Sequence, residues 1–156
     1  MKWRLFLVCV LTFATAPAAD LLVIPGGFGT RRLLERPEIL AWVRERSRAA
    51  EITASVCTGS LVLARAGVLE GCAVTTHHQR HDLLRELAPA ATVHEDRRFL
   101  VNPATATRGV IATSAGISAG IDLSLHLVAL LHGASVAEQT ARYMEYSWRD
   151  DAGATR

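Results

Sequence analysis

The sequence has few cysteines, little net charge and no long apolar run, and each scarcity argues against a class of protein. Its three cysteines, Cys9, Cys57 and Cys72, are too few and too unevenly spaced for a disulfide scaffold or a zinc cluster. The apolar run at residues 5–14 is too short to span a bilayer as a helix, so we expect no stable membrane anchor. A formal net charge of +2, with scattered arginines, argues against a nucleic-acid partner.

The overall composition is typical of one globular domain. The 156 residues are 50% apolar and 21% charged, which is enough to bury a core and far from the composition of a disordered chain. We find no internal repeat and no low-complexity segment. The small number of cysteines favours a reducing compartment, and a cytoplasmic protein is therefore the first expectation.

The N-terminal segment, residues 1–19, has two competing interpretations. Lys2 and Arg4 precede the apolar run, and small residues surround Ala18, which is the layout of a secretory signal cleaved after Ala18. The same segment also contains a candidate buried strand, WRLFLVCVL, that follows two basic residues. The two interpretations are evenly balanced, and the first would make the protein an exported one.

Strand-like and helix-like patterns then alternate over residues 20–150, which we expect to form one domain. Short apolar runs predict strands at 21–25, 51–56, 72–76 and 109–116, and longer periodic segments predict helices at 35–49, 60–69, 80–89, 117–133 and 135–148. Two short β-like pieces lie at 91–95 and 97–101. This order predicts an α/β fold, flavodoxin-like and doubly wound, with a mostly parallel sheet and helices on both faces. Ligands of such sheets bind at the carboxyl ends of the strands.

Cys57 follows one of these predicted strands and precedes a predicted helix. Unpaired N–H groups and the helix dipole at such a turn favour the reactive thiolate. Gly59 would allow the close backbone approach that a tight turn needs, and the Thr58 N–H would face a developing oxyanion. Gly26 and Gly27 expose further N–H groups at a neighbouring strand end. The alternative is that Cys57 is a buried, inert thiol that ends an apolar strand.

Four segments, in their order and spacing, resemble the ThiJ/PfpI superfamily, which is related to class I glutamine amidotransferases. They are DLLVIPGGFGTR, SVCTGSLVLARAGVLEG, AVTTHH and TSAGISAGIDLSLHLV, and the resemblance extends from about residue 18 to residue 148. Cys-Thr-Gly at the turn, with TTH and SAGISAGID downstream, is most similar to the isonitrile hydratase branch. Since the last segment, ARYMEYSWRDDAGATR, leaves no room for the helix-turn-helix domain of related regulators, we expect a member of the stand-alone branch. The resemblance implies a small-molecule substrate, a homodimer, and neither a cofactor nor a metal.

Site residues follow from this resemblance position by position. Catalytic roles are implied for four residues: Cys57 as nucleophile, Thr58 and Gly27 as oxyanion-hole donors, and His77 as a histidine near the site. Substrate contacts are expected from Gly26, from the Thr58 hydroxyl and from Ser114. Proteases of the superfamily have a histidine directly after the nucleophile, and Thr58 at that position argues against a protease.

One departure from the family pattern bears on activity. Family members begin with a further strand, whose loop carries an acidic residue hydrogen-bonded to the nucleophile, and neither has a counterpart here. Asp20 opens the predicted first strand and is not expected to reach the sulfur. We therefore expect an N-terminally shortened fold, or a gene start that lies further upstream. Loss of the acid would slow turnover by about 10²–10⁴-fold.

Three other arrangements of residues have a simpler explanation. GISAG places Ser118 in a G-x-S-x-G pattern, but too little chain follows for the acid and histidine of a hydrolase, and small residues there suit close helix–sheet packing. His77 and His81 have metal-ligand spacing without further ligands, so we expect solvated or capping histidines. Asp122 and His126 are expected to form a local hydrogen-bonded pair or a packing contact, without a catalytic role.

Two function classes remain open. The first is a cysteine-dependent hydratase or hydrolase of the isonitrile hydratase type, with a deglycase or amidase as a variant. The second is a weak or inactive member that senses oxidation or a metabolite through Cys57.

Overall fold

The computed structural model describes residues 12, 13 and 15–149, and the fold within that range is the predicted α/β arrangement. Most of the segment for which a signal or a substitute strand was considered lies outside the described residues, so both interpretations stay predictions. The central sheet has the strand order β1-β2-β6-β5. Its strands are β1 (Leu21–Ile24), β2 (Ile52–Val56), β6 (Val110–Ser114) and β5 (Phe99–Asn102).

The register of the sheet places the candidate turn beside its neighbours. Strands β1, β2 and β6 are parallel, whereas β5 runs antiparallel to β6. Val56, the last residue of β2, pairs with Ser114, the last residue of β6, and Ile24 at the end of β1 pairs with Ser55. The loops that follow β1, β2 and β6 therefore meet at one edge of the sheet, as expected for carboxyl ends of parallel strands.

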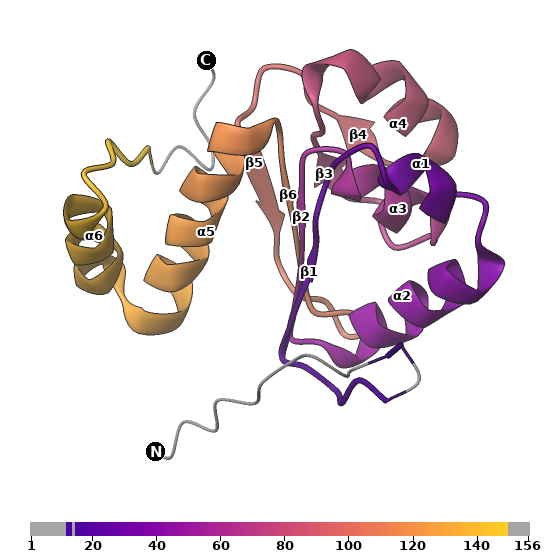
Figure 1. Cartoon of the computed structure of the whole chain (residues 1–156), viewed down its shortest axis with the longest axis horizontal. Coiled ribbons are helices and arrows are strands. Elements are labelled where there is room, and N and C mark those ends of the chain that lie inside the picture. Colours follow the sequence, from indigo (N-terminus) through magenta and orange to yellow (C-terminus); the bar gives the residue numbers. More distant parts are fainter. Residues whose placement is uncertain (1–11, 14, 150–156) are drawn as a thin grey trace.

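Helices cover both faces of this sheet (Figure 1). One face carries α1 (Thr30–Leu33), α2 (Pro37–Ala49), α3 (Gly59–Arg65) and α4 (His81–Leu87). On the other face α5 (Ile117–His132) packs against the sheet, and α6 (Ala134–Tyr143) packs on the outer side of α5. A short 3₁₀ turn, η1 (His78–Arg80), precedes α4. The one-turn helix α1 is absent from the sequence-based prediction, because TRRL is too short to show a helical period. Within the described residues, no helix is both long and apolar enough to cross a membrane.

The predicted strand at 72–76 is wrong in length and partner. Only β3 (Ala73–Val74) forms, and it pairs with β4 (Thr92–Val93) in a separate two-stranded sheet. The Asn102 side chain, from the end of β5, links β3 to the main sheet where no backbone ladder joins them. Its amide accepts from the Ala73 N–H (2.8 Å) and donates to the Ala73 carbonyl (2.9 Å).

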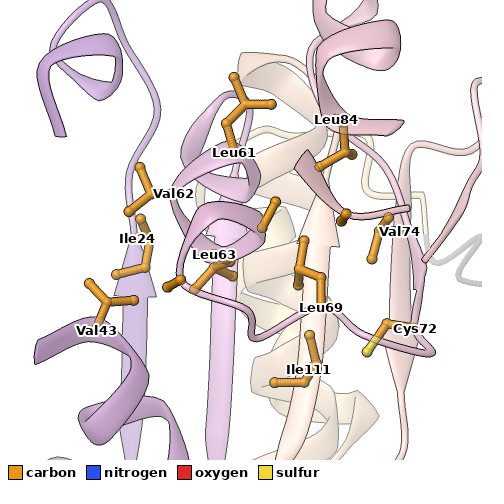
Figure 2. Close-up of a cluster of buried hydrophobic side chains, with 13 residues drawn as sticks. Ile24, Val43, Leu61, Val62, Leu63, Leu69, Cys72, Val74, Leu84 and Ile111 are labelled. Carbon is orange, nitrogen blue, oxygen red and sulfur yellow. The ribbon is translucent and has the colours of Figure 1, made fainter. Parts of the chain in front are cut away.

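The larger core cluster lies between α2, α3, α4 and the sheet (Figure 2). Leu61, Leu63 and Leu84 are almost completely buried there, and each such side chain contributes roughly 1.5–3 kcal/mol by leaving water. Cys72 lies in the same cluster, and burial raises the pKa of its thiol. The packed core therefore holds α3, which follows the candidate turn, against the sheet.

The predicted last helix, 135–148, ends early at Tyr143. Glu145 adopts a positive φ of 52°, which no α-helix continues through, and the chain turns back onto α5. Polar contacts to Asp122 hold the returning segment: the Tyr146 hydroxyl donates to Oδ1 (3.1 Å), and the Trp148 indole donates to the backbone carbonyl (3.3 Å). A buried hydrogen-bonding partner on α5 thus overrides the helical pattern of the tail.

Candidate active site

Cys57 occupies a strained turn between β2 and α3. Its φ is 56°, a left-handed conformation that costs a non-glycine residue about 1–2 kcal/mol. Four hydrogen bonds hold it: the Cys57 N–H donates to the carbonyls of Ser114 and Ala115 (3.1 Å each), while its carbonyl accepts from the hydroxyls of Ser60 (3.1 Å) and Thr76 (3.0 Å). The thiol is half-buried. This backbone is that of a nucleophile elbow.

Two glycines allow the backbone to pass close to this turn. A Cβ on Gly26 would lie 2.8 Å from the Cys57 Cβ and 2.9 Å from the Thr58 nitrogen. A Cβ on Gly59 would lie 2.2 Å from the Ile24 carbonyl oxygen, which is too close for any side chain. The expected close approach at Gly59 is therefore confirmed. Gly26 lies against the elbow itself.

The Thr58 side chain ties the elbow to the β1–α1 loop. Its hydroxyl oxygen accepts from the Gly27 N–H (3.0 Å), and the Thr30 hydroxyl donates to the Gly27 carbonyl (2.8 Å). The Gly27 N–H expected in the oxyanion hole is thus already engaged. The Thr58 N–H has no hydrogen-bond partner within residues 12–13 and 15–149, so it is open to a ligand.

Thr58→Val tests the link between the elbow and this loop. Valine keeps the shape of the side chain and removes the acceptor, so we expect a loss of about 1 kcal/mol in the free energy of unfolding, together with slower turnover of any substrate. Thr58→Ser keeps the hydroxyl and serves as the control. Urea unfolding of the three proteins gives the comparison, and equal stabilities for valine and serine would contradict the role of the hydroxyl.

A cavity of about 430 Å³ is lined by Thr76 and Ala115, which hydrogen-bond to the Cys57 backbone, but not by Cys57 or Thr58 themselves. One wall is formed by the loop after β6 and the first turn of α5, including Ala115 and Ile117, and the other by polar side chains that precede or begin α4. Those polar residues are Thr76, His77, His78, His81 and, from the loop after β4, Glu95. The cavity therefore has an apolar wall facing a wall of imidazoles.

The two histidines considered as metal ligands have different settings. His77 caps η1, since its Nδ1 accepts from the Gln79 N–H (3.3 Å), and burial, followed by repulsion from neighbouring cationic groups, lowers the pKa of its imidazole. His81 is not the solvated residue that was expected, because it is buried at the start of α4. In the described part of the chain no three His, Cys, Asp or Glu side chains are grouped to hold a metal ion.

Ser114 lies inside the sheet. Its side chain is fully buried and donates to the Ser55 carbonyl (3.4 Å), while its own carbonyl accepts from the Cys57 N–H. It is not among the residues that line the cavity. The geometry therefore favours a role in positioning Cys57 over a substrate contact.

The remaining two arrangements are accounted for by packing. A Cβ on Gly120 would lie 2.7 Å from Val56 Cγ1, which confirms that the small residues around Ser118 allow α5 to approach the sheet. Asp122 pairs with Arg98, which lies outside α5. The ring centroid of His126 lies 5.2 Å from that of Phe99. Asp122 is therefore paired outside its own helix, and His126 makes a packing contact, which was one of the two expected explanations.

Comparison with known proteins agrees with this fold. Residues 7–130 match the DJ-1/PfpI family, and the chain belongs to that family. The isonitrile hydratase of Pseudomonas putida is 38% identical over 136 residues, which cover 87% of this chain and 56% of the hydratase. The HTH-type transcriptional regulator CdhR of Pseudomonas aeruginosa is 34% identical, with coverage of 78% of this chain and 34% of the regulator.

A solved structure gives the same fold. The crystal structure of a ThiJ/PfpI family protein from Pseudomonas syringae has a TM-score of 0.75 and 33% identity, over 91% of this chain and 57% of the other. The chain therefore spans a little more than half the length of the hydratase and of this crystallised protein. A mostly parallel sheet with helices on both faces is common to the family.

Sequence reasoning missed two features of the site. His81 was weighed as a metal ligand and expected to be a solvated or capping residue, and it was not placed beside Glu95, which is 14 residues away along the chain. It also missed the cluster around Asp122. The buried position of Asp122 in an apolar helix was a usable signal, since an unpaired carboxylate is not stable there.

Proposed function

We propose that this protein is a cysteine-dependent hydratase that adds water to small isonitriles. The observation that carries the proposal is the strained elbow at Cys57, with the open Thr58 N–H beside it and a cavity next to it. The 38% identity with an isonitrile hydratase supports the choice of substrate class. Cys57 is the nucleophile, and the Thr58 backbone N–H stabilises charge that develops on the bound substrate.

The reaction has two parts. The Cys57 thiolate forms a bond to the terminal carbon of R–NC, and that carbon takes a proton, giving a thioimidate, R–N=CH–S–Cys. Water then adds to the same carbon and one of its protons goes to the nitrogen. The other proton leaves the new hydroxyl for the solvent as the carbon–sulfur bond breaks, and it replaces the proton that the carbon took from the solvent in the first part. The products are R–NH–CHO and the regenerated thiolate, so one water is consumed for each isonitrile.

The shape of the cavity suits a compact, largely apolar substituent R. Ala115, Ile117 and Ile121 supply an apolar wall, and Gly116 leaves room where a Cβ would lie 3.6 Å from the His77 ring. A volume of about 430 Å³ is in the range that holds a small organic molecule. We also propose that the chain forms a homodimer, as the resemblance to the family implies.

The purified protein should convert an alkyl isonitrile to its N-alkylformamide. Cyclohexyl isonitrile is a suitable probe, and the formyl proton of the product can be followed by NMR against a protein-free control. Formation of the formamide in proportion to protein concentration is the expected result. No formamide above the control, with folded protein present, would contradict the proposal. Release of ammonia from an amide instead would point to the amidase variant.

A sensor without turnover is the second candidate, and the match to a transcriptional regulator favours it. In that case Cys57 would be oxidised by peroxide or would bind a metabolite reversibly. Mass spectrometry after mild peroxide distinguishes the two functions when it is run beside the formamide assay. Addition of two oxygen atoms at Cys57 without any isonitrile turnover is the sensor's expected result.

A further inference from the structure

Thr30 is a buried threonine that the proposed reaction does not use. It is 4% exposed, at the start of α1, and its hydroxyl faces the loop that carries Gly27. That hydroxyl lies 2.8 Å from the Gly27 carbonyl oxygen and 3.3 Å from the Thr58 hydroxyl oxygen. Since a hydroxyl has one proton, the shorter contact takes it, and Thr30 acts as a donor to the Gly27 carbonyl.

The proton of the Thr58 hydroxyl is left without a strong acceptor. The Thr58 hydroxyl oxygen accepts from the Gly27 N–H at 3.0 Å, which uses one of its lone pairs. Among residues 12–13 and 15–149, the acceptor that its proton can reach is the Gly27 carbonyl at 3.3 Å. That hydrogen bond is long, and Thr30 already donates to the same oxygen at 2.8 Å. The O–H of Thr58 is therefore able to turn toward a ligand.

The same loop brings these groups to the nucleophile. Gly26 approaches the elbow so closely that a Cβ there would lie 2.8 Å from the Cys57 Cβ and 2.9 Å from the Thr58 nitrogen. Gly27, the next residue, bonds to the Thr58 hydroxyl. The N–H and the O–H of Thr58 therefore both lie against a two-residue stretch that also contacts the carbon carrying the reactive sulfur. Gly27 is exposed and Thr58 is half-buried, so a substrate can reach this side of the elbow.

We propose that Thr30 is a positioning residue: by donating to the Gly27 carbonyl, it keeps the Thr58 O–H available to the substrate nitrogen. The proposal rests on the proposed function. In the thioimidate the nitrogen has a lone pair, and negative charge develops on it as water adds to the neighbouring carbon. A hydrogen bond from the Thr58 O–H stabilises that charge, and no covalent bond of Thr58 or Thr30 changes. Without the Thr30 hydroxyl, the Thr58 O–H turns to the Gly27 carbonyl and is lost to the substrate.

The test follows the loss of the covalent adduct, because water addition is the step in which the nitrogen takes up charge. Protein is mixed with an equal amount of cyclohexyl isonitrile and quenched over time, and intact-protein mass spectrometry measures how fast the adduct mass disappears. We expect Thr30→Val to slow this loss about 3–10-fold, which is the effect of one neutral hydrogen bond. Thr30→Ser keeps the hydroxyl and should restore the wild-type rate.

A double-mutant cycle and a matched control separate positioning from a structural effect. Thr30→Val combined with Thr58→Val should be no slower than Thr58→Val alone, because the hydroxyl that Thr30 positions is already gone. Thr53 is a comparable threonine in β2: it is 1% exposed, and its hydroxyl donates to the Ser47 hydroxyl at 3.0 Å. Thr53→Val should lower the unfolding midpoint without changing the lifetime of the adduct.

A further variant keeps the test decisive if Thr30→Val does not fold. Thr30→Ala removes the hydroxyl without introducing a new group, and the same slowing is expected of it. Loss of the adduct at the wild-type rate in Thr30→Val and Thr30→Ala would overturn the role of Thr30 alone. Slowing by the same factor with and without the Thr58 hydroxyl would indicate a structural effect and also overturn it. Absence of adduct and formamide in folded wild type would overturn the proposed function, and this inference with it.

Discussion

Turnover of an alkyl isonitrile is expected to disappear when Cys57 is replaced with alanine. Removal of the atom that forms the covalent bond costs an enzyme with a nucleophile about 10⁶-fold in rate. The formamide assay measures the loss, and Cys9→Ser, which changes a cysteine outside the four motifs, is the control expected to keep activity. Survival of turnover in Cys57→Ala would contradict a covalent mechanism altogether.

The same position should show a trade-off between activity and stability. Alanine at φ 56° has the same backbone strain as cysteine, whereas glycine has none. We therefore expect Cys57→Gly to be more stable than Cys57→Ala by about 1 kcal/mol, with both inactive. Urea unfolding provides the comparison. If the alanine variant is as stable as the glycine variant, the elbow is not strained in solution.

Asp122→Ala is expected to cause the largest loss of stability, about 3–5 kcal/mol. The Asp122 side chain is completely buried and accepts from the Arg98 guanidinium, the Tyr146 hydroxyl and the Arg149 N–H. Truncation would leave the Arg98 charge, on a side chain only 15% exposed, without its counter-charge. The segment after α6 would also lose its anchor.

The matched control for Asp122→Ala is Asp82→Ala. Asp82 pairs with Arg85 at 2.9 Å, but its side chain is 97% exposed, so the unfolding midpoint should hardly move. Thermal and urea unfolding test both variants, and increased proteolysis after residue 143 would report release of the tail. Similar midpoints for the two variants would show that the Asp122 cluster does not stabilise the fold.

The parts of the fold predicted well are those where local pattern and tertiary packing agree. Short apolar-rich runs predicted β1, β2 and β6 as strands, and their alternation with amphipathic helices predicted the parallel order. β2 is buried, whereas β1 is an edge strand on which Leu21 and Val23 are exposed. The elbow could also be predicted from the sequence, because Cys-Thr-Gly after a buried strand already indicates a tight turn into a helix. In these segments a few adjacent residues are enough to predict the local structure.

The parts predicted poorly depend on single long-range polar contacts. The Asn102 side chain bonds to the β3 backbone in place of a ladder. Asp122 accepts a hydrogen bond from Tyr146 in the segment where the helical pattern of the tail is interrupted. The engagement of Gly27 by Thr58 joins residues 31 apart in sequence. No local periodicity reports such contacts, because each is set by where one side chain lies after the chain has folded.

The central claim is that Cys57 is a nucleophile toward an isonitrile carbon. The most direct measurement is intact-mass and peptide-level mass spectrometry of the protein quenched during turnover of cyclohexyl isonitrile. We expect one added isonitrile mass on Cys57, and none in Cys57→Ala. We expect none on Cys72, because burial raises the pKa of its thiol. Formamide release with no adduct on Cys57, or with the label on another residue, would contradict it.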